Sequence, residues 1–121
     1  SPDECLEIVR AAAGELPLSV CVPVTQARDA WVARLPEAGA AGITLAPPRG
    51  TLIREQKPVS GRLYGAALLP QAIAAVQALR KSGLTLLAAC GILRRADADM
   101  LLAAGASAVQ LDVVLWRGWA D

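Results

Sequence analysis

Short apolar runs alternate along the chain with segments in which apolar residues recur every third or fourth position. Residues 18–24, 42–46, 84–90 and 108–115 are nearly continuous apolar runs of strand length. Runs of this kind, apolar on successive positions, are typical of strands in a parallel sheet covered by helices. The sequence therefore predicts four such strands.

The segments between these runs have helical spacing. Within 26–36, for example, Ala27, Trp31 and Leu35 fall on one face. Pro70 is suited to the first turn of a helix that Gly83 ends. The predicted helices cover 3–13, 26–36, 70–82 and 94–104. Residues 48–69, rich in Gly, Pro and charge, are expected to form a long irregular loop, a kind of loop that often carries function.

Alternation of helices and strands predicts the α/β class, and one junction occurs twice. Ala38–Leu45 and Ala104–Leu111 both join a helix through a glycine and a tight turn to the next strand. Repetition of this unit around a ring is the plan of a TIM barrel, and about four βα units make half of one. We therefore expect residues 1–121 to form a single half-barrel domain within a larger protein or assembly.

A half-barrel leaves two sheet edges unpaired and exposes the side chains that fill the barrel interior. Seven apolar residues are expected on that exposed side. They are Leu18, Val20, Val22, Val24, Leu84, Leu86 and Leu87. The expected partner is therefore the remaining half of the barrel, a second copy or another subunit.

Charge and composition narrow the function. Twelve basic and eleven acidic residues give a net charge of +1, which argues against a nucleic-acid surface. Histidine is absent, so His-based catalysis and His metal sites are excluded, and no metal site is expected. Three cysteines without a C-x-x-C pair fit a reducing, cytoplasmic location. No uncharged run approaches the length of a membrane span, and the acidic start Ser1–Glu4 is unlike a signal peptide, so no membrane contact is expected.

Two glycine-bearing segments could bring backbone N–H groups to an anion. Ser60–Gly65 precedes the Pro70 helix, and Cys90–Ile92 lies between a strand end and the next helix. A glycine at such a place permits close approach of a phosphate, and a helix N-terminus favours negative charge. The same glycines equally fit tight turns without a ligand.

From about residue 14 to 118 the chain resembles the C-terminal half of the dihydroorotate dehydrogenase family, FMN-dependent TIM-barrel enzymes of pyrimidine biosynthesis. Gly61-Arg-Leu-Tyr-Gly65 is similar to the family's G-G-x-S-G loop, and Leu87–Ile92 is similar to its strand ending in G-G-I. Ala103–Leu111 is close to its A-G-A-S-A-V-Q run. If FMN binds, the resemblance implies that Gly61, Arg62, Gly65, Gly91 and Ile92 contact it.

Several positions depart from the family pattern. Cys21 stands where the resemblance implies a flavin-contacting lysine, and Ala46-Pro47 stand where it implies an asparagine. Cys90 replaces the first glycine of G-G-I, and Asp112 lies where the family receives the FMN phosphate. A carboxylate within about 4 Å of a phosphate repels it by on the order of 1 kcal/mol per charge in water. The family's catalytic Cys or Ser belongs to the other half of the barrel, so no catalytic residue is expected here.

Several side chains have both a structural and a functional interpretation. Cys21 and Cys90 are expected to be small core residues, because both lie in apolar strands. Neither has a neighbouring base in sequence that would lower the pKa of its thiol. Asp112 is either a functional carboxylate at a strand end or the ion-pair partner of Arg94, Arg95 or Arg117. Trp116 and Trp119 are expected to cover a core edge or to form a contact patch.

Two functions follow from these observations. In the first, the chain is a degenerate relative of the family, a pseudoenzyme with a structural or interaction role and weakened or lost flavin binding, so that no cofactor is expected. In the second, it belongs to an FMN-dependent oxidoreductase completed by another segment. Whether the chain is an enzyme stays open at this point.

Overall fold

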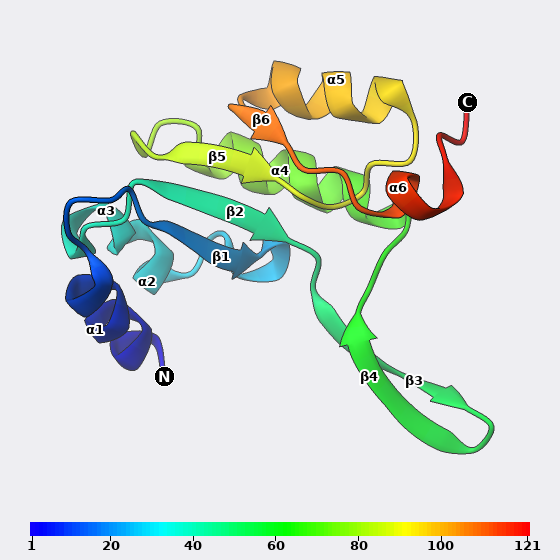
Figure 1. Cartoon of the computed structure of the whole chain (residues 1–121), viewed down its shortest axis with the longest axis horizontal. Helices are drawn as coiled ribbons and strands as arrows, with labels where there is room; N and C mark the ends of the chain where they lie inside the picture. The colour runs from blue at the N-terminus through cyan, green and yellow to red at the C-terminus, as the bar shows by residue number, and fades with distance from the viewer.

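A four-stranded parallel sheet forms the centre of the chain (Figure 1). The computed structural model describes all residues, 1–121. The strands are β1 (Ser19–Pro23), β2 (Gly42–Ala46), β5 (Thr85–Ala88) and β6 (Ala108–Val109). They pair in the order β1-β2-β5-β6, and every pairing is parallel. The α/β class and the four neighbouring parallel strands in sequential order are therefore confirmed.

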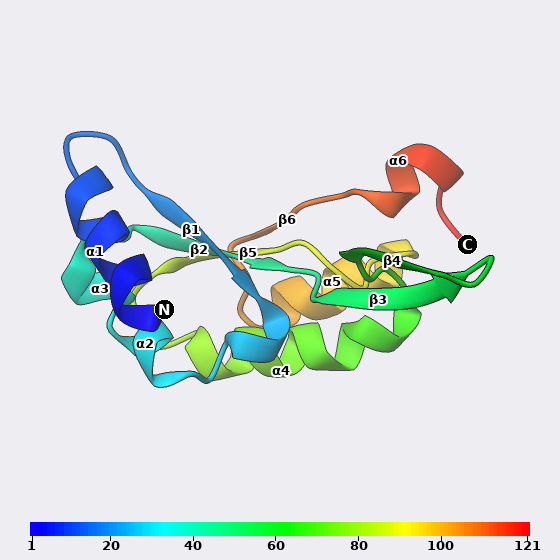
Figure 2. The ribbon, with the colours of Figure 1, turned by 90° about the horizontal axis from the view of Figure 1, so that it is seen from below.

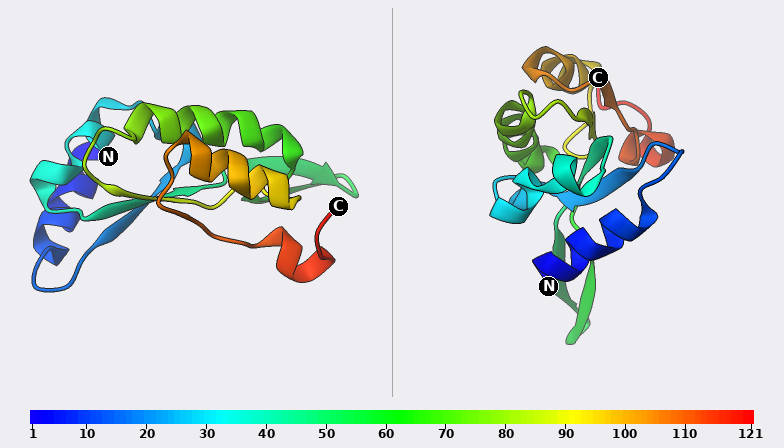
Figure 3. Two further views of the ribbon diagram at one scale, coloured as in Figure 1. Left: turned by 90° about the horizontal axis from the view of Figure 1, so that it is seen from above. Right: turned by 90° about the vertical axis from the view of Figure 1, so that its left-hand side faces the viewer.

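Helices cover one face of this sheet, as the side views show (Figure 2). The long helices α4 and α5 lie side by side (Figure 3) and are in contact. The N-terminal helix packs on the two short helices that follow β1. The helices are α1 (Pro2–Ala12), α2 (Ala30–Ala33), α3 (Leu35–Ala38), α4 (Leu69–Leu79), α5 (Arg95–Ala104) and α6 (Val113–Arg117), with 3-10 turns η1 (Val24–Gln26) and η2 (Ala66–Leu68). No helix combines the length and the hydropathy that crossing a bilayer would require.

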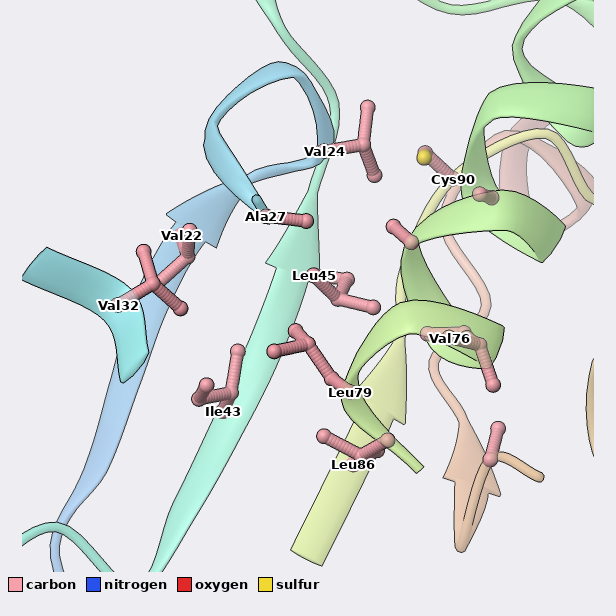
Figure 4. Packing of buried hydrophobic residues seen from close by; sticks show 14 of the residues in the cluster. Val22, Val24, Ala27, Val32, Ile43, Leu45, Val76, Leu79, Leu86 and Cys90 are labelled. Atoms are coloured by element: carbon pink, nitrogen blue, oxygen red, sulfur yellow. The ribbon is translucent and has the colours of Figure 1, made fainter. Parts of the chain in front are cut away.

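The core lies between the sheet and the helices (Figure 4). Alternate strand residues point into it, because successive side chains of a strand face opposite sides. Val22 of β1, Ile43 and Leu45 of β2, and Leu86 of β5 are at most 1% exposed. The residues of β2 and β5 pack toward α4, where Val76 is fully buried, and Val22 lies beside Val32 of α2 (Figure 4).

The opposite face of the sheet is open and largely polar. Ser19, Cys21 and Thr85 are exposed there, and Thr44 and Leu87 are half-buried. No helix covers this side of the sheet, which is called the open face below (Figure 2).

The expectation that the apolar strand residues lie on an uncovered side was therefore wrong for most of them. Val22, Val24 and Leu86 are buried in the helix-covered core. Leu18, Val20 and Leu84 are partly buried against the same core. Only Leu87, among the seven, lies on the open face, because the strands alternate in polarity more than their apolar appearance suggested.

The helix predicted at 26–36 is broken into η1, α2 and α3. Asp29 adopts an extended backbone that separates η1 from α2. Pro36 lies in the first turn of α3, where its missing N–H costs nothing, whereas it would interrupt a continuous helix. By contrast α1 and α5 match their predicted segments closely, and Pro70 lies in the first turn of α4, as expected. The prediction that Gly83 ends this helix was wrong, because α4 ends at Leu79 with Arg80 as its C-cap.

Residues 48–69 are not an irregular loop. They contain a β-hairpin of β3 (Arg49–Arg54) and β4 (Lys57–Arg62) that extends away from the body of the chain (Figures 1 and 3). Its turn residues Glu55 and Gln56 have φ values of 48° and 63°, and positive φ at both central positions characterises a type I′ turn. The sequence concealed the hairpin because the turn lacks the usual Asn-Gly pair and the strands contain Pro58 and two glycines.

The last strand is shorter than predicted. Residues 108–115 were expected to be one strand, but β6 ends at Val109 and α6 begins at Val113. An apolar run of this length fits either a strand or a buried helix segment, and periodicity alone does not separate the two.

Substitution of two adjacent leucines tests which strand residues face the core and which lie on the open face. Leu86→Ala removes a side chain that is 1% exposed in the core and should lower the free energy of unfolding by about 2–5 kcal/mol. Leu87→Ala, on the open face, should lower it by less than about 1.5 kcal/mol, because little packing is lost. Urea denaturation followed by circular dichroism measures both. Equal losses, or a larger loss for Leu87→Ala, would contradict the assignment of the faces.

Candidate functional site

A hollow of about 280 Å³ lies on the open face toward the carboxyl ends of the strands. Parallel strands end at one edge of a sheet, so side chains near their ends gather there. The hairpin and the segment after β6 supply its rim. Its lining consists of Ser19, Cys21, Thr44, Ala46, Pro47, Arg62, Ala89, Gln110, Leu111 and Asp112.

The floor of this hollow is polar and made of small side chains. The hydroxyls of Ser19 and Thr44 lie 3.3 Å apart, from neighbouring strands. The Cys21 side chain is exposed beside them, so the expectation of a buried core cysteine at position 21 was wrong. An eight-stranded TIM barrel is filled by bulky branched side chains, whereas this floor leaves room for a partner's side chains or for a ligand.

Asp112 is the most constrained side chain at the rim. The Tyr64 hydroxyl donates a hydrogen bond to Asp112 Oδ2 at 2.5 Å, and Trp116 Nε1 donates one to Oδ1 at 3.2 Å. These two donors, with a smaller contribution from the positive charge of Arg62, hold the pKa of the Asp112 carboxyl below its ordinary value. The same hydrogen bond to Asp112 raises the pKa of the Tyr64 phenol. Asp112 is therefore ionised at neutral pH.

Asp112 makes none of the ion pairs considered for it. Arg94 pairs with Asp97 at 2.9 Å, and Arg95 pairs with Asp121 at 3.6 Å. Asp97 is the buried carboxylate of α5 and also accepts hydrogen bonds from the backbone N–H groups of Leu93 and Arg94. Aromatic donors therefore satisfy Asp112, and the arginines serve the structure around α5.

Gly91 has a packing role that requires glycine. Its φ is +82°, and a Cβ at this position would lie 2.6 Å from the backbone N and Cα of Leu69. The residue is buried where the loop after β5 crosses the start of α4. This close contact accounts for the glycine without a ligand.

The five residues implied as FMN contacts do not share one site. Gly65, Gly91 and Ile92 surround a hollow with Asp112, but its volume is only about 10 Å³. Arg62 lines the larger hollow above the open face. Gly61 lies in β4 opposite Gly50, on the projecting hairpin. The structure thus brings three of the five together and separates the other two.

Cys90 is buried, as expected for a core cysteine. Burial raises the pKa of its thiol to about 11, so the thiolate is scarce at neutral pH. Cys90 therefore lacks the character of a nucleophile. No group of three or more His, Cys, Asp or Glu side chains is placed to hold a metal ion.

A further hollow of about 350 Å³, which the sequence does not predict, shares lining residues with the hollow of about 10 Å³. Tyr64, Gly65, Leu93, Val113, Trp116 and Arg117 line it. It depends on α6, whose residues fall partly within the strand predicted at 108–115. The spacing of Asp112 and Trp116, four positions apart, was the available signal for this helical turn.

Trp116 and Trp119 differ in environment. Trp116 is 83% exposed, so it does not cover a core edge. Trp119 is half-buried against the core, and the guanidinium of Arg95 lies 5.0 Å from its ring centre. Trp119 therefore fits the expected role of covering a core edge.

A comparison of the sequence with protein-family models found no matching family, and a comparison with curated proteins found no match.

The hydrogen bond from Tyr64 to Asp112 can be tested by titration. Tyr64→Phe removes the largest cause of the lowered pKa, so the pKa of Asp112 should rise toward about 4, the ordinary value for Asp. NMR titration of the carboxyl carbons measures it. The contribution of this pair to stability should be present above the ordinary Asp pKa and lost as the pH falls through the lowered value, because the folded state binds the proton less tightly.

The lowered pKa of Asp97 provides the internal control, since Asp97 does not contact Tyr64 and should titrate identically in both proteins. An unchanged Asp112 titration in Tyr64→Phe would show that the hydrogen bond is not formed in solution.

Proposed function

We propose that the chain is a degenerate relative of the dihydroorotate dehydrogenase family, a half-barrel that has lost flavin chemistry and serves as an interaction domain. The observation that carries this proposal is the hollow of about 10 Å³ between Gly65, Gly91, Ile92 and Asp112. A space of that size suits about one water molecule, whereas an FMN phosphate is several times larger.

The charge at this place also disfavours a phosphate. Asp112 is ionised and fixed by Tyr64 and Trp116, so it directs a full negative charge toward the hollow. The backbone of Leu69 closes the side of Gly91 on which a Cβ would lie, so this side offers no space to a ligand.

The open face supports the interaction role. β1 and β6 are the outer strands of the sheet, and each has one unpaired edge. Unpaired edges are places where another chain can add strands. The partners that fit are the remaining half of the barrel, a second copy, or another subunit that supplies bulky side chains over the small polar floor.

The alternative is an FMN-dependent oxidoreductase of the dihydroorotate dehydrogenase type, completed by another segment. The observation in its favour is Arg62, which reaches the 280 Å³ hollow from the hairpin. A guanidinium is well suited to bidentate phosphate binding, so Arg62 offers a different place for the FMN phosphate.

An FMN titration separates the two functions. With flavin fluorescence as the readout, we expect no saturable binding tighter than about 10 µM, equivalent to roughly −7 kcal/mol. Purified protein should also lack the visible absorbance of bound flavin. Saturable binding below that concentration would overturn the loss of flavin chemistry.

If FMN were bound, Arg62→Ala would identify the site. Weakened binding in Arg62→Ala, with unchanged binding in the matched hairpin variant Arg49→Ala, would support the oxidoreductase alternative. Arg49 lies opposite Arg62 in the hairpin but does not line the hollow.

A further inference from the structure

The hairpin β3–β4 has features that the body of the chain does not explain. Its strands pair with each other and form a sheet of their own, separate from the parallel sheet. An isolated two-stranded hairpin is marginally stable in water and normally gains a third strand or a packing surface. Yet Leu52, Ile53 and Val59 are 67%, 73% and 54% exposed. The hairpin is therefore built for a contact that the chain alone does not make.

The two edges of the hairpin differ in their capacity to pair. Leu63 N donates to Pro48 O at 2.9 Å, which continues the ladder beyond the hairpin base. In an antiparallel ladder, residue pairs that are hydrogen-bonded to each other alternate with pairs that are not. The register therefore leaves the backbone N–H and C=O groups of Arg49, Thr51 and Ile53 facing outward from β3. On β4 the outward positions include Pro58, which has no N–H to donate. The β3 edge is open to a further strand, and the β4 edge is blocked.

The charge of the hairpin indicates what kind of strand would pair. Four cationic side chains, Arg49, Arg54, Lys57 and Arg62, accompany a single carboxylate, Glu55. All five side chains are exposed. A strand from the hairpin of a second copy would bring the same net charge of +3 and be repelled, whereas an acidic strand would be attracted.

One face of the hairpin also offers space for apolar side chains. Gly50 and Gly61 lie directly opposite each other. The Leu63 side chain covers Gly50, whereas the space over Gly61 is free. Both glycines line a hollow of about 380 Å³, together with Leu52, Val59 and Leu63. A strand added along β3 would place alternate side chains on this face. Aliphatic side chains would fit against Leu52, and acidic side chains on the other face would lie on the side of Arg49 and Arg62.

We propose that the β3 edge is a docking site for an extended segment of a partner protein in which acidic and aliphatic residues alternate. The segment adds as a third strand to the hairpin, with backbone hydrogen bonds to Arg49, Thr51 and Ile53. This inference rests on the proposed interaction role and names the chemistry of one partner.

The test uses the full chain and a fluorescein-labelled peptide of about six residues in which Glu and Val alternate, close to the usual strand length. Fluorescence anisotropy should report a Kd of about 10–100 µM that weakens as salt is raised. A peptide with alternating Lys and Val should bind at least about tenfold more weakly, because its charge is reversed.

Two proline variants form a matched pair. Thr51 and Ser60 are cross-strand partners whose hydroxyls lie 2.7 Å apart, so either substitution removes the same contact. Thr51→Pro removes an outward N–H from the open edge and should weaken peptide binding at least about tenfold. Ser60→Pro removes an outward N–H from the blocked edge, so the Kd for the peptide should stay within about twofold of that of the unmodified chain. Hydrogen exchange of the hairpin amides shows whether each variant keeps the hairpin.

Charge variants provide an independent readout if either proline disturbs the hairpin. Arg49→Glu should weaken binding at least about tenfold, because Arg49 lies on the face of β3 that the acidic side chains would meet. Arg10→Glu, at an exposed position on α1, should not change binding beyond the general effect of net charge, about twofold.

Several results would overturn the proposal. They are no saturable peptide binding, equal losses in the two proline variants, and equal binding of the Lys–Val peptide. A dimer in sedimentation that Thr51→Pro abolishes would identify a second copy as the occupant instead. The two proposals also fail separately: FMN binding would refute the loss of flavin chemistry, whereas absence of peptide binding without FMN binding would refute only this partner.

Discussion

Burial of one face of the parallel sheet under the helices is the constraint on which the rest of the structure depends. Val22, Ile43, Leu45 and Leu86 come from three neighbouring strands and are at most 1% exposed against the helices. Such side chains contribute about 1.5–3 kcal/mol each on burial, so they determine which way every strand faces. Because side chains alternate, the same choice places Ser19, Cys21, Thr44 and Thr85 on the opposite side. The open face is a consequence of the core.

The strand ends follow from the same arrangement. Since the strands are parallel, the segments leaving β5 and β6 meet at one edge, and there the chain satisfies its polar groups internally. Tyr64 and Trp116 donate to Asp112, and Gly91 permits the loop after β5 to touch Leu69. These donors and this space are used within the chain. This local geometry is the basis of the proposed loss of flavin chemistry.

The sequence predicted an element well where local residues, such as a proline or a glycine, mark its ends. β2 matches its predicted bounds at Gly42–Ala46, and Pro70 and Gly105 mark helix ends where the structure has them. The hairpin was missed because its type I′ turn uses Glu55 and Gln56, which carry no turn signature. The orientation of the strands was also misjudged, since nearly continuous apolar runs conceal which alternate residues face the helices. The partners of Asp112 come from positions 64 and 116, and only the folded chain brings Tyr64 to it.

The two-faced sheet, with a core on one side and an open face on the other, is the central claim, and the three cysteines report on it directly. Cys21 is exposed on the open face, Cys5 is exposed on α1, and Cys90 is buried. The measurement is labelling of the native chain with a maleimide, followed by mass spectrometry of the peptides. The account predicts that Cys21 is labelled together with Cys5, and that Cys90 is labelled only after denaturation. Protection of Cys21 in the native chain, or ready labelling of Cys90, would contradict it.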